Sequence, residues 1–265
     1  MKQKQLITAL LPTQLLIICL IFSFASCQKS ATTSATKNSA SSVNNSAAVA
    51  SSSLVAWYKF TSGSLADYSG NNNNIVFSNA TPTTDYMGKP NNAYLFNGSG
   101  SYMVVNNSAS LNPSNITIGV LIKPLGFYQG IGGNSRILMK GIDDQSSGIY
   151  LLGFNNDGAY YGTYGDNQFF SAGATSSSNV VKLNKWQKVV YTYNGTTAKL
   201  YINDMLASQV NATASFNANI DPLNIGKTGR ADYPYWFNGV IDEIRIYNVA
   251  VSQLQAQQIG VELGK

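Results

Sequence analysis

The chain has 265 residues, of which 11% are charged, and carries a formal net charge of +5 with no histidine. The absence of histidine excludes Ser-His-Asp triads, imidazole general bases and the usual catalytic zinc sites. Lysine and arginine do not cluster with interleaved aromatic residues, which argues against nucleic acid as a partner. Because charges are few, Asn, Ser, Thr, Gly and Tyr must form much of the surface, and this composition suits neutral polar ligands.

The first 27 residues have the features of an export signal. Lys2 and Lys4 precede an apolar stretch over 6–24, and 24–27 reads Phe-Ala-Ser-Cys. Small residues before a cysteine resemble a bacterial lipobox, so we expect Cys27 to be lipidated and to become the mature N-terminus. Several acyl chains there would anchor the protein stably to a membrane. A retained spanning helix is the alternative, because the apolar stretch approaches the roughly 20 residues that such a helix needs.

A polar linker follows this signal. Residues 28–53 are almost entirely Ser, Ala, Thr and Asn, which predicts a disordered tether. Gln28 is not the aspartate that retains lipoproteins in the inner membrane of enteric bacteria, so we expect the outer membrane, at its periplasmic face or at the cell surface. Since Cys19 leaves with the signal and Cys27 is lipidated, the folded part is expected to contain no disulfide.

From residue 54 to residue 265 the sequence predicts one all-β domain. Short β-rich runs alternate with clusters of Asn, Gly, Asp and Ser, as in an antiparallel two-sheet sandwich. Asn194-Gly195 and Asn156-Asp157-Gly158 each lie between two such runs, and both are typical of hairpin turns.

Two local patterns refine this prediction. In the run TTAKLYI, alternation places Leu200 on the buried face and Tyr201 on the other face. Near the C-terminus SQLQAQQI predicts a single short helix, which places Leu254 and Ile259 at roughly helical spacing behind a capping Ser252.

The ordered strand phrases carry a family resemblance. They read LVAWYKF from Leu54, WQKVVYTYNGTTAKLYINDMLASQV from Trp186, LNIGK from Leu223 and WFNGVIDEIRIYNVAVSQLQAQQI from Trp236. This set resembles the laminin-G-type jelly-roll domains of the concanavalin A-like lectin and glucanase superfamily. The resemblance extends from Leu54 to about Ile259 and implies a two-sheet antiparallel jelly roll.

The resemblance also implies a metal site. Strand alternation in GVIDEIRIYN places Asp242 on the same side as Ile244, and a carboxylate on an apolar face needs a partner. Related folds often hold a structural Ca²⁺ here, shared with a loop near the N-terminus, which in this chain is LADYSGNNNNI with Asp67. Asp67 and Asp242 are therefore the expected ligands, completed by amides, carbonyls and water. The alternative is an Asx-turn at Asp67 and backbone hydrogen bonds to Asp242.

The acidic residues give little support to an enzyme. Glycoside hydrolysis needs two carboxyl groups, but the only glutamates are Glu243 and Glu262, and the E-x-D-x-x-E string of glucanases with this fold is missing. The best remaining pairs are Asp143 with Asp144 and Asp157 with Asp166. Each of these aspartates lies beside Gly, Asn or Ser, where turn chemistry explains it.

Binding is the function that the composition favours. A carbohydrate site needs exposed aromatic rings among amides, and two regions qualify. The ligand-contact candidates are Tyr160, Tyr161, Tyr164 and Asn167 in the first region and Tyr233, Tyr235 and Trp236 in the second. The alternative is that these rings pack in the core, as aromatic residues of strands often do. Trp57 and Trp186, inside strand-like phrases, are expected in the core.

These observations predict a non-catalytic, lectin-like domain that binds a polysaccharide or other glycan and is carried by a surface lipoprotein. Adhesion to a host or matrix protein, or a role in assembly, is the alternative, because laminin-G-type domains do both. A polysaccharide hydrolase is the least supported reading, given the few acidic residues.

Overall fold

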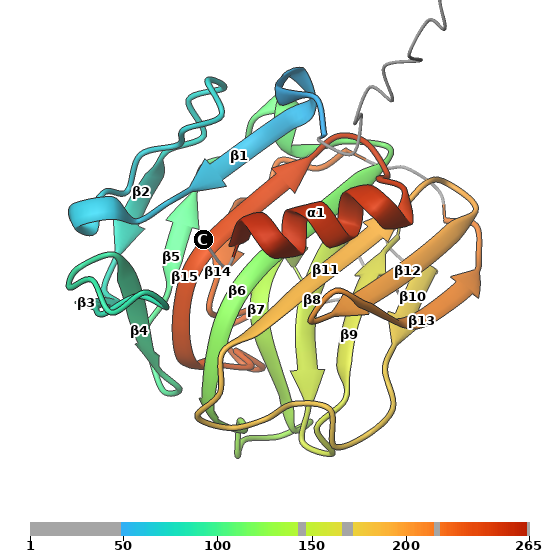
Figure 1. Cartoon of the computed structure of the whole chain (residues 1–265). Coiled ribbons are helices and arrows are strands. Elements are labelled where there is room, and N and C mark those ends of the chain that lie inside the picture. The colour runs from blue at the N-terminus through green and yellow to red at the C-terminus, as the bar shows by residue number, and fades with distance from the viewer. Residues whose placement is uncertain (1–48, 143–146, 166–171, 215–217, 264–265) are drawn as a thin grey trace, which may run out of the picture. The chain divides into compact units, whose positions relative to one another are not determined.

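The computed structural model describes residues 49–142, 147–165, 172–214 and 218–263 of the chain. They form two antiparallel β-sheets and one α-helix (Figure 1). The chain divides after Val43, and the whole described part belongs to the unit that begins at Asn44. The predicted two-sheet antiparallel sandwich is confirmed.

Several predicted features lie outside the described residues. They are the signal segment with Cys27, most of the tether, Asn167, and the acidic residues Asp143, Asp144 and Asp166. Among the helices of the described part, none has both the length and the apolar character needed to cross a bilayer.

The larger sheet, sheet A, has the strand order β13-β12-β11-β6-β15-β4-β3, and β1 also pairs with β15. Its strands are β1 (Leu54–Tyr58), β3 (Thr81–Thr83), β4 (Ala93–Asn97), β6 (Ile116–Gly126), β11 (Gln187–Tyr193), β12 (Thr197–Ile202), β13 (Met205–Asn211) and β15 (Asn238–Tyr247). One edge of β15 is shared, because β4 pairs with residues 238–241 and β1 with residues 244–247. Residues 242 and 243 therefore lie at the junction between β4 and β1.

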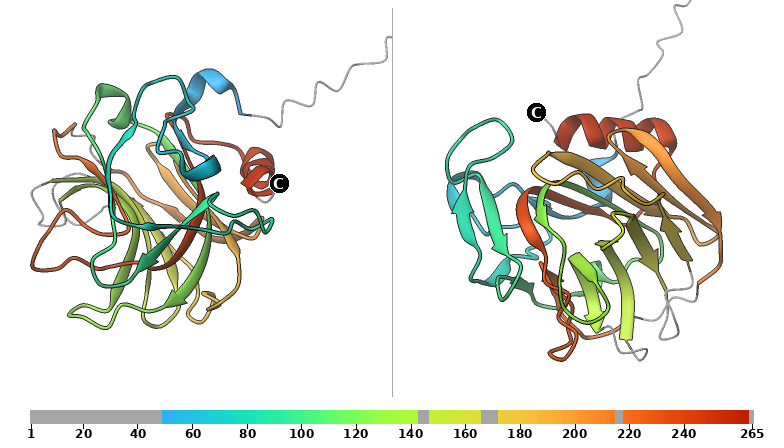
Figure 2. Two further views of the ribbon diagram at one scale, coloured as in Figure 1. Left: turned by 90° about the vertical axis from the view of Figure 1, so that its left-hand side faces the viewer. Right: turned by 90° about the horizontal axis from the view of Figure 1, so that it is seen from below.

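The second sheet, sheet B, has the strand order β10-β9-β8-β7-β14-β5-β2. Its strands are β2 (Ile75–Ser78), β5 (Met103–Val105), β7 (Asn134–Ile142), β8 (Ser147–Asn155), β9 (Tyr160–Tyr164), β10 (Ala172–Thr175) and β14 (Leu223–Ile225). The short 3₁₀ turns are η1 (Ser51–Ser53), η2 (Thr61–Gly63) and η3 (Ala109–Leu111). Seen from below, strands of the two sheets form opposite layers, and the helix lies outside sheet A (Figure 2).

The alternation predicted for β12 is confirmed on one face and modified on the other. Leu200 is fully buried between the sheets. Tyr201 points to the outer face of sheet A, yet it is only 1% exposed because helix α1 (Gln253–Leu263) packs over it. Ala256 and Ile259 supply the buried side of the helix. The outer face of sheet A is thus a second, smaller hydrophobic core.

Helix α1 is the predicted C-terminal helix, and Ser252 caps it as expected. The Gln255 N–H donates to Ser252 Oγ at 3.3 Å, and the Ser252 N–H donates to Gln255 Oε1 at 2.9 Å, which is the reciprocal arrangement of a capping box. Leu254 and Ile259 do not share a face, since Leu254 is 61% exposed and Ile259 is 1% exposed. Five positions separate Leu254 from Ile259, and this spacing places them about 140° apart around a helix.

Both predicted hairpin turns are present. Asn194-Gly195 joins β11 to β12, with the Thr197 N–H donating to Asn194 Oδ1 at 2.7 Å. The turn at 156–158 joins β8 to β9, and its Gly158 has a φ of +79°. Asp157 accepts hydrogen bonds from the Ala159 N–H and the Ser178 hydroxyl, which lower the pKa of its carboxyl. The hydrogen bonds of the turn therefore explain the presence of Asp157 without a catalytic role.

The folded part begins earlier than the prediction places it. The last residues of the expected tether form η1, in which Ser53 Oγ donates to the Ala50 carbonyl at 2.6 Å. The Ser53 carbonyl accepts a hydrogen bond from the Asn248 N–H at 2.9 Å. This bond fastens the start of the domain to the end of β15.

Candidate functional site

The first predicted aromatic region, on β9, is buried. Tyr160 and Tyr164 are at most 1% exposed and point into the space between the sheets. The Tyr160 hydroxyl donates to Gln187 Oε1 at 2.9 Å and the Tyr164 hydroxyl donates to the Pro113 carbonyl at 3.1 Å. Burial raises the pKa of both. These two tyrosines are core residues, and the expectation that they contact a ligand is wrong.

Tyr161 alternates with these two residues and points to the outer face of sheet B. Its ring crosses Gly153, where an added Cβ would lie 3.0 Å from the Tyr161 hydroxyl. The side chain is only 9% exposed, so its ring offers no open stacking surface.

The second predicted region lies on an excursion of the chain between β14 and β15. The Gly226 N–H donates to the Ile137 carbonyl at 2.8 Å and the Arg136 N–H donates to the Tyr235 carbonyl at 2.9 Å. The chain therefore follows β7 both before and after residues 227–234. The Phe237 N–H closes the base of this excursion by donating to the Gly226 carbonyl at 2.9 Å. We call residues 226–237 the β14–β15 loop.

Thr228 holds the β14–β15 loop in one shape. This residue is fully buried, and its N–H donates to the Pro234 carbonyl at 2.9 Å. Its hydroxyl donates to the Tyr233 carbonyl at 2.8 Å and accepts from the Arg230 N–H at 3.0 Å. A loop braced in this way presents its side chains without a large ordering cost on binding.

Half-buried aromatic rings gather around this loop. The centroid of Trp236 is 5.9 Å from that of Tyr102, which is 4.9 Å from the 43% exposed Phe77. The Tyr235 ring lies 5.9 Å from Tyr128 and 6.2 Å from Tyr233. We call these two neighbouring groups the aromatic surface; its members are Phe77, Tyr102, Tyr128, Tyr233, Tyr235 and Trp236. Of the three predicted residues of the second region, Tyr233 and Tyr235 therefore lie beside each other, while Trp236 contacts Tyr102.

Cations accompany the aromatic surface. Lys227 Nζ lies 4.1 Å from the Tyr102 ring centroid, and burial lowers the pKa of Lys227. The Arg230 guanidinium lies 4.8 Å from the Tyr233 ring. Arg136 lies between two rings, 4.7 Å from Tyr235 and 5.3 Å from Tyr161. Arg136 therefore connects the loop to the outer face of sheet B.

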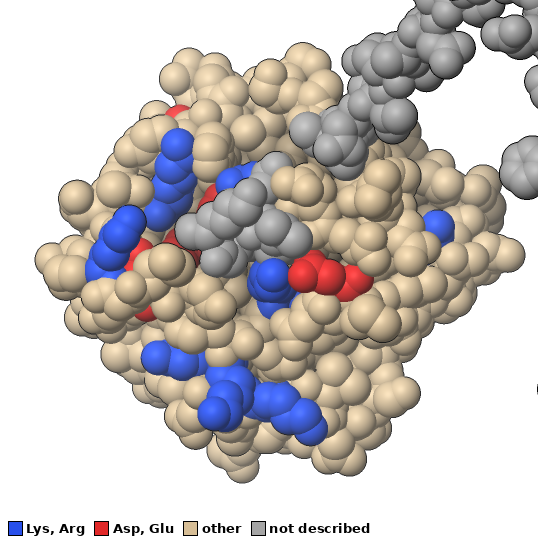
Figure 3. Space-filling view, viewed as in Figure 1, with Lys and Arg blue, Asp and Glu red and all other residues tan. Residues whose placement is uncertain are grey.

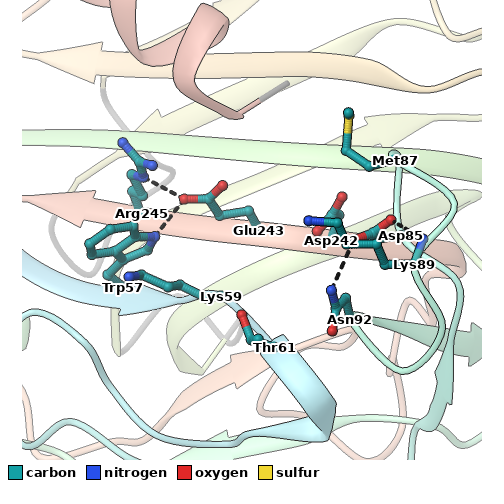
Figure 4. Close-up of a pocket in the computed structure, with 10 residues that line it drawn as sticks. All are labelled: Trp57, Lys59, Thr61, Asp85, Met87, Lys89, Asn92, Asp242, Glu243 and Arg245. Atoms are coloured by element: carbon teal, nitrogen blue, oxygen red, sulfur yellow. Dashed lines mark hydrogen bonds and ion pairs between the residues drawn. The ribbon is translucent and has the colours of Figure 1, made fainter. Parts of the chain in front are cut away.

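A polar pocket of about 360 Å³ lies at the junction of β1, β4 and β15 (Figure 4). Strand β15 has a β-bulge between Ile241 and Glu243. Ile241 pairs with Ile122 of β6 and Glu243 pairs with the adjacent Leu121, so Asp242 has no partner residue on β6. Asp242 consequently lines the pocket together with Glu243. The expectation that Asp242 lies on the same side of the strand as Ile244, and on the other side from Glu243, is wrong. Asp242 and Glu243 line the same pocket, because a bulge inserts one extra residue into the alternation.

Charges of both signs line this pocket. Glu243 accepts hydrogen bonds from Trp57 Nε1 and from Arg245 Nε, the latter at 2.6 Å. Burial, followed by the nearby charges of Asp85 and Glu243, raises the pKa of Asp242 to about 7, although the Tyr86 N–H donates to it at 3.0 Å. Space-filling shows acidic side chains between basic ones at the left of the molecule, where β1, β3 and β4 lie (Figure 3).

The structure does not assemble Asp67 and Asp242 into one calcium site. The carboxylate of Asp67 accepts hydrogen bonds from the N–H groups of Trp57, Ser69 and Asn73 at 2.8–2.9 Å and from the Ser69 hydroxyl at 2.7 Å. These donors repel a cation, and Asp67 does not line the pocket of Asp242. Among the described residues, no three His, Cys, Asp or Glu side chains are placed to hold a metal. Calcium binding stays a prediction.

The two tryptophans assigned to the core lie partly exposed instead. Trp57 belongs to β1. Lys59 Nζ lies 3.7 Å and the Arg245 guanidinium 4.5 Å from the centroid of its ring. Trp186 precedes β11 on the outer side of sheet A, where its ring centroid lies 6.0 Å from that of Tyr86. Cations lie over the Trp57 ring, as they do over rings of the aromatic surface.

The family of the chain is shown by its match to a laminin-G family model. This model, described as the concanavalin A-like lectin/glucanases superfamily, matches residues 97–257, which is more than half of the chain. The chain belongs to this superfamily, as the strand phrases predicted. No curated protein matches the chain.

Solved structures show the same jelly-roll fold. The binding domain of Paraclostridial Mosquitocidal Protein 1 is 18% identical, with a TM-score of 0.63, and covers 79% of this chain and 52% of its own. The binding domain of botulinum neurotoxin DC, solved with SialylT and with rat synaptotagmin II, is 15% identical, with TM-scores of 0.60 and 0.61 and coverages of 80% and 52%. The chain thus spans about half of these toxin domains.

A third structure matches over almost its entire length. Domain 4 of AbnA, a GH43 extracellular arabinanase from Geobacillus stearothermophilus solved in complex with arabinotriose, is 18% identical with a TM-score of 0.53. The match covers 78% of this chain and 98% of that domain. These similarities concern the fold.

Proposed function

We propose that the chain is a non-catalytic carbohydrate-binding domain of a bacterial lipoprotein. The observation that carries the proposal is the aromatic surface, in which Trp236, Tyr233 and Tyr235 are half-buried beside Tyr102 and Tyr128. Sugar rings stack on such faces, and the braced β14–β15 loop holds the rings ready for them.

Two of the solved structures support a binding role for this fold. Domain 4 of AbnA is a domain solved with arabinotriose, and the toxin binding domain is solved with SialylT. A catalytic role finds less support in the side chains. In the pocket, Glu243 is held by Arg245 and Trp57, and it neighbours Asp242 on the same strand instead of facing it across a substrate cleft.

The proposal is tested by a glycan array probed with the full chain in mild detergent, in Ca²⁺ and in EDTA. We expect saturable binding that falls about tenfold in Trp236→Ala or Tyr233→Ala, equivalent to about 1.4 kcal/mol. Tyr68→Ala is the matched control, because Tyr68 is 44% exposed but lies at the edge of β1, where it contacts Trp57. A folded chain that binds no glycan would remove the proposal.

Protein-directed adhesion is the second candidate, and the edge of sheet A favours it. Strand β13 ends that sheet and exposes Met205, Leu206 and Val210 by 71%, 43% and 39%. An exposed edge strand with apolar side chains can accept an added strand from a partner protein. Replacing Leu206 with lysine would weaken such pairing and leave glycan binding unchanged.

The anchor belongs to the proposal as well. The lipobox pattern at Cys27 and the polar composition of residues 28–53 support a location on the outer membrane, at the periplasmic face or the cell surface. Incorporation of labelled palmitate into the chain, and its loss in Cys27→Ser, tests this assignment. Unchanged membrane association in Cys27→Ser would favour a retained spanning helix.

A further inference from the structure

Lys227 is a cation of the β14–β15 loop that lies beside aromatic rings. Its ammonium is 4.1 Å from the ring centroid of Tyr102 and 5.8 Å from that of Trp236. Burial lowers the pKa of Lys227, and among the residues that the structure describes no acidic side chain counters this effect or forms an ion pair with it. The protein without ligand therefore holds a partly desolvated positive charge that no carboxylate neutralises.

The surroundings of Lys227 add further positive charge. Residues 226–237 contain two cations, Lys227 and Arg230, and one acid, Asp232. The ion pair of that acid is with Arg230, so it does not compensate Lys227. The guanidinium of Arg136, which is only 5% exposed, lies 4.7 Å from the Tyr235 ring centroid. Charges of one sign that gather in this way attract a ligand of the opposite sign.

Solvent has access to the groups concerned. The side chains of Lys227, Tyr102 and Trp236 are all partly exposed, and Phe77 beside Tyr102 is 43% exposed. A sugar can therefore approach Trp236 and Lys227 together, without any movement of the core. The two residues are joined by the braced loop, which keeps the ring and the ammonium in a fixed relation.

We propose that the aromatic surface selects acidic glycans, in which a sugar stacked on Trp236 carries an anionic substituent that pairs with Lys227; this inference rests on the proposed function. A lysine ammonium is a compact charge with three donors, so a carboxylate or a sulfate group can be its partner. The preference arises because a neutral sugar leaves the desolvated cation uncompensated, whereas an acidic sugar neutralises it.

The test compares sugars that differ in charge alone. Calorimetry on the full chain in mild detergent measures binding of tetragalacturonate, tetramannuronate and tetraglucuronate, each beside its methyl ester, and of a sulfated neocarratetraose. We expect the best acidic probe to bind about tenfold more tightly than its neutral counterpart. Added salt should reduce this preference, because it screens the charge of a partly exposed pair.

Two substitutions assign the preference to Lys227. Lys227→Met removes the ammonium and should abolish the difference between acid and ester, whereas Lys227→Arg should retain it. Lys123→Met is the matched control, because Lys123 Nζ also lies over a tryptophan ring, 5.2 Å from the centroid of Trp186, but on sheet A. Its removal should leave the preference unchanged. A merely structural lysine would lower the thermal midpoint in Lys227→Met and leave the preference for the acid intact.

The outcomes separate this inference from the proposed function. Equal binding of acids and esters, or a preference that persists in Lys227→Met, would overturn the role of Lys227 and leave a glycan-binding domain standing. Array hits that are all neutral would do the same. Selective binding of the sulfated probe would support the inference and identify the anion as sulfate. A folded chain that binds none of the probes and no glycan on the array would overturn both.

Discussion

Replacing Asp242 with asparagine should stabilise the domain above pH 7. The bulge on β15 turns this carboxyl into the pocket, where burial and the charges of Asp85 and Glu243 raise its pKa from 3.8 to about 7. In the unfolded chain the carboxyl returns to its ordinary pKa. Between about pH 4 and pH 7 the folded state therefore binds more protons than the unfolded state, and stability falls as the pH rises through this window.

The size of the effect follows from the pKa difference. A shift of about three units, at about 1.4 kcal/mol for each unit, sets an upper bound of about 4 kcal/mol for the cost of ionised Asp242 above pH 7. Below about pH 3 this cost is absent, because the carboxyl is largely protonated in both states. Asparagine mimics the protonated acid, and its side-chain oxygen can still accept from the Tyr86 N–H.

Urea unfolding of wild type and Asp242→Asn at pH 4, 6 and 8 in EDTA measures the difference. We expect near equality at pH 4 and an advantage for the variant that grows to about 1–4 kcal/mol at pH 8. Asp157→Asn is the control of opposite sign, since hydrogen bonds lower the pKa of that turn carboxyl. A variant less stable than wild type at pH 8 would refute the reasoning. Repeating the series with Ca²⁺ shows whether a cation removes the penalty in wild type.

Three further experiments test the hydrogen bonds of Asp67, the buried face of helix α1 and the role of Thr228 in the β14–β15 loop. Asp67→Ala removes the acceptor of four hydrogen bonds and should lower the free energy of unfolding in urea by about 2–4 kcal/mol, equally in Ca²⁺ and in EDTA. A loss of stability seen only with Ca²⁺ would indicate that this loop binds the metal. Ile259→Ala should cost about 2–4 kcal/mol, whereas the exposed Leu254→Ala should change stability by less than about 0.5 kcal/mol; equal effects would contradict the observed helix face. Thr228→Val should weaken glycan binding in calorimetry and cost about 1–2 kcal/mol, and unchanged affinity would show that the brace does not position the rings.

The fold was predictable because its signals are local. Turn residues such as Asn194-Gly195 and Asn156-Asp157-Gly158 mark hairpins regardless of what the strands pack against. The capping box at Ser252 marks the start of α1 in the same way. The burial of a strand residue could not be predicted where it depends on a helix that packs over the sheet. Tyr201 has the pattern of an exposed strand residue, and only the helix that covers sheet A buries it.

The candidate site was harder to predict because it depends on irregular backbone and on distant pairing. A bulge at Asp242 inverts the expected alternation, and no residue type in GVIDEIRIYN marks it. Tyr102 joins Trp236 only because β5 pairs with β14, more than a hundred residues later. On β9, alternation could be read from the sequence, but which of Tyr160 and Tyr161 faces the core could not.

The two outer faces of the sandwich explain where binding can occur. Helix α1 covers the outer face of sheet A with apolar side chains, so burial there serves stability. Sheet B is different, because the β14–β15 loop leaves it between β14 and β15 and carries half-buried aromatic rings. A loop that leaves the sheet and returns to the same strand can raise aromatic rings beside this face without breaking the core, since Phe237 is buried at its base. Apart from changes at the buried Thr228, changes to residues 227–234 should therefore alter ligand choice more readily than stability, whereas changes at Gly226 or Phe237 should affect both.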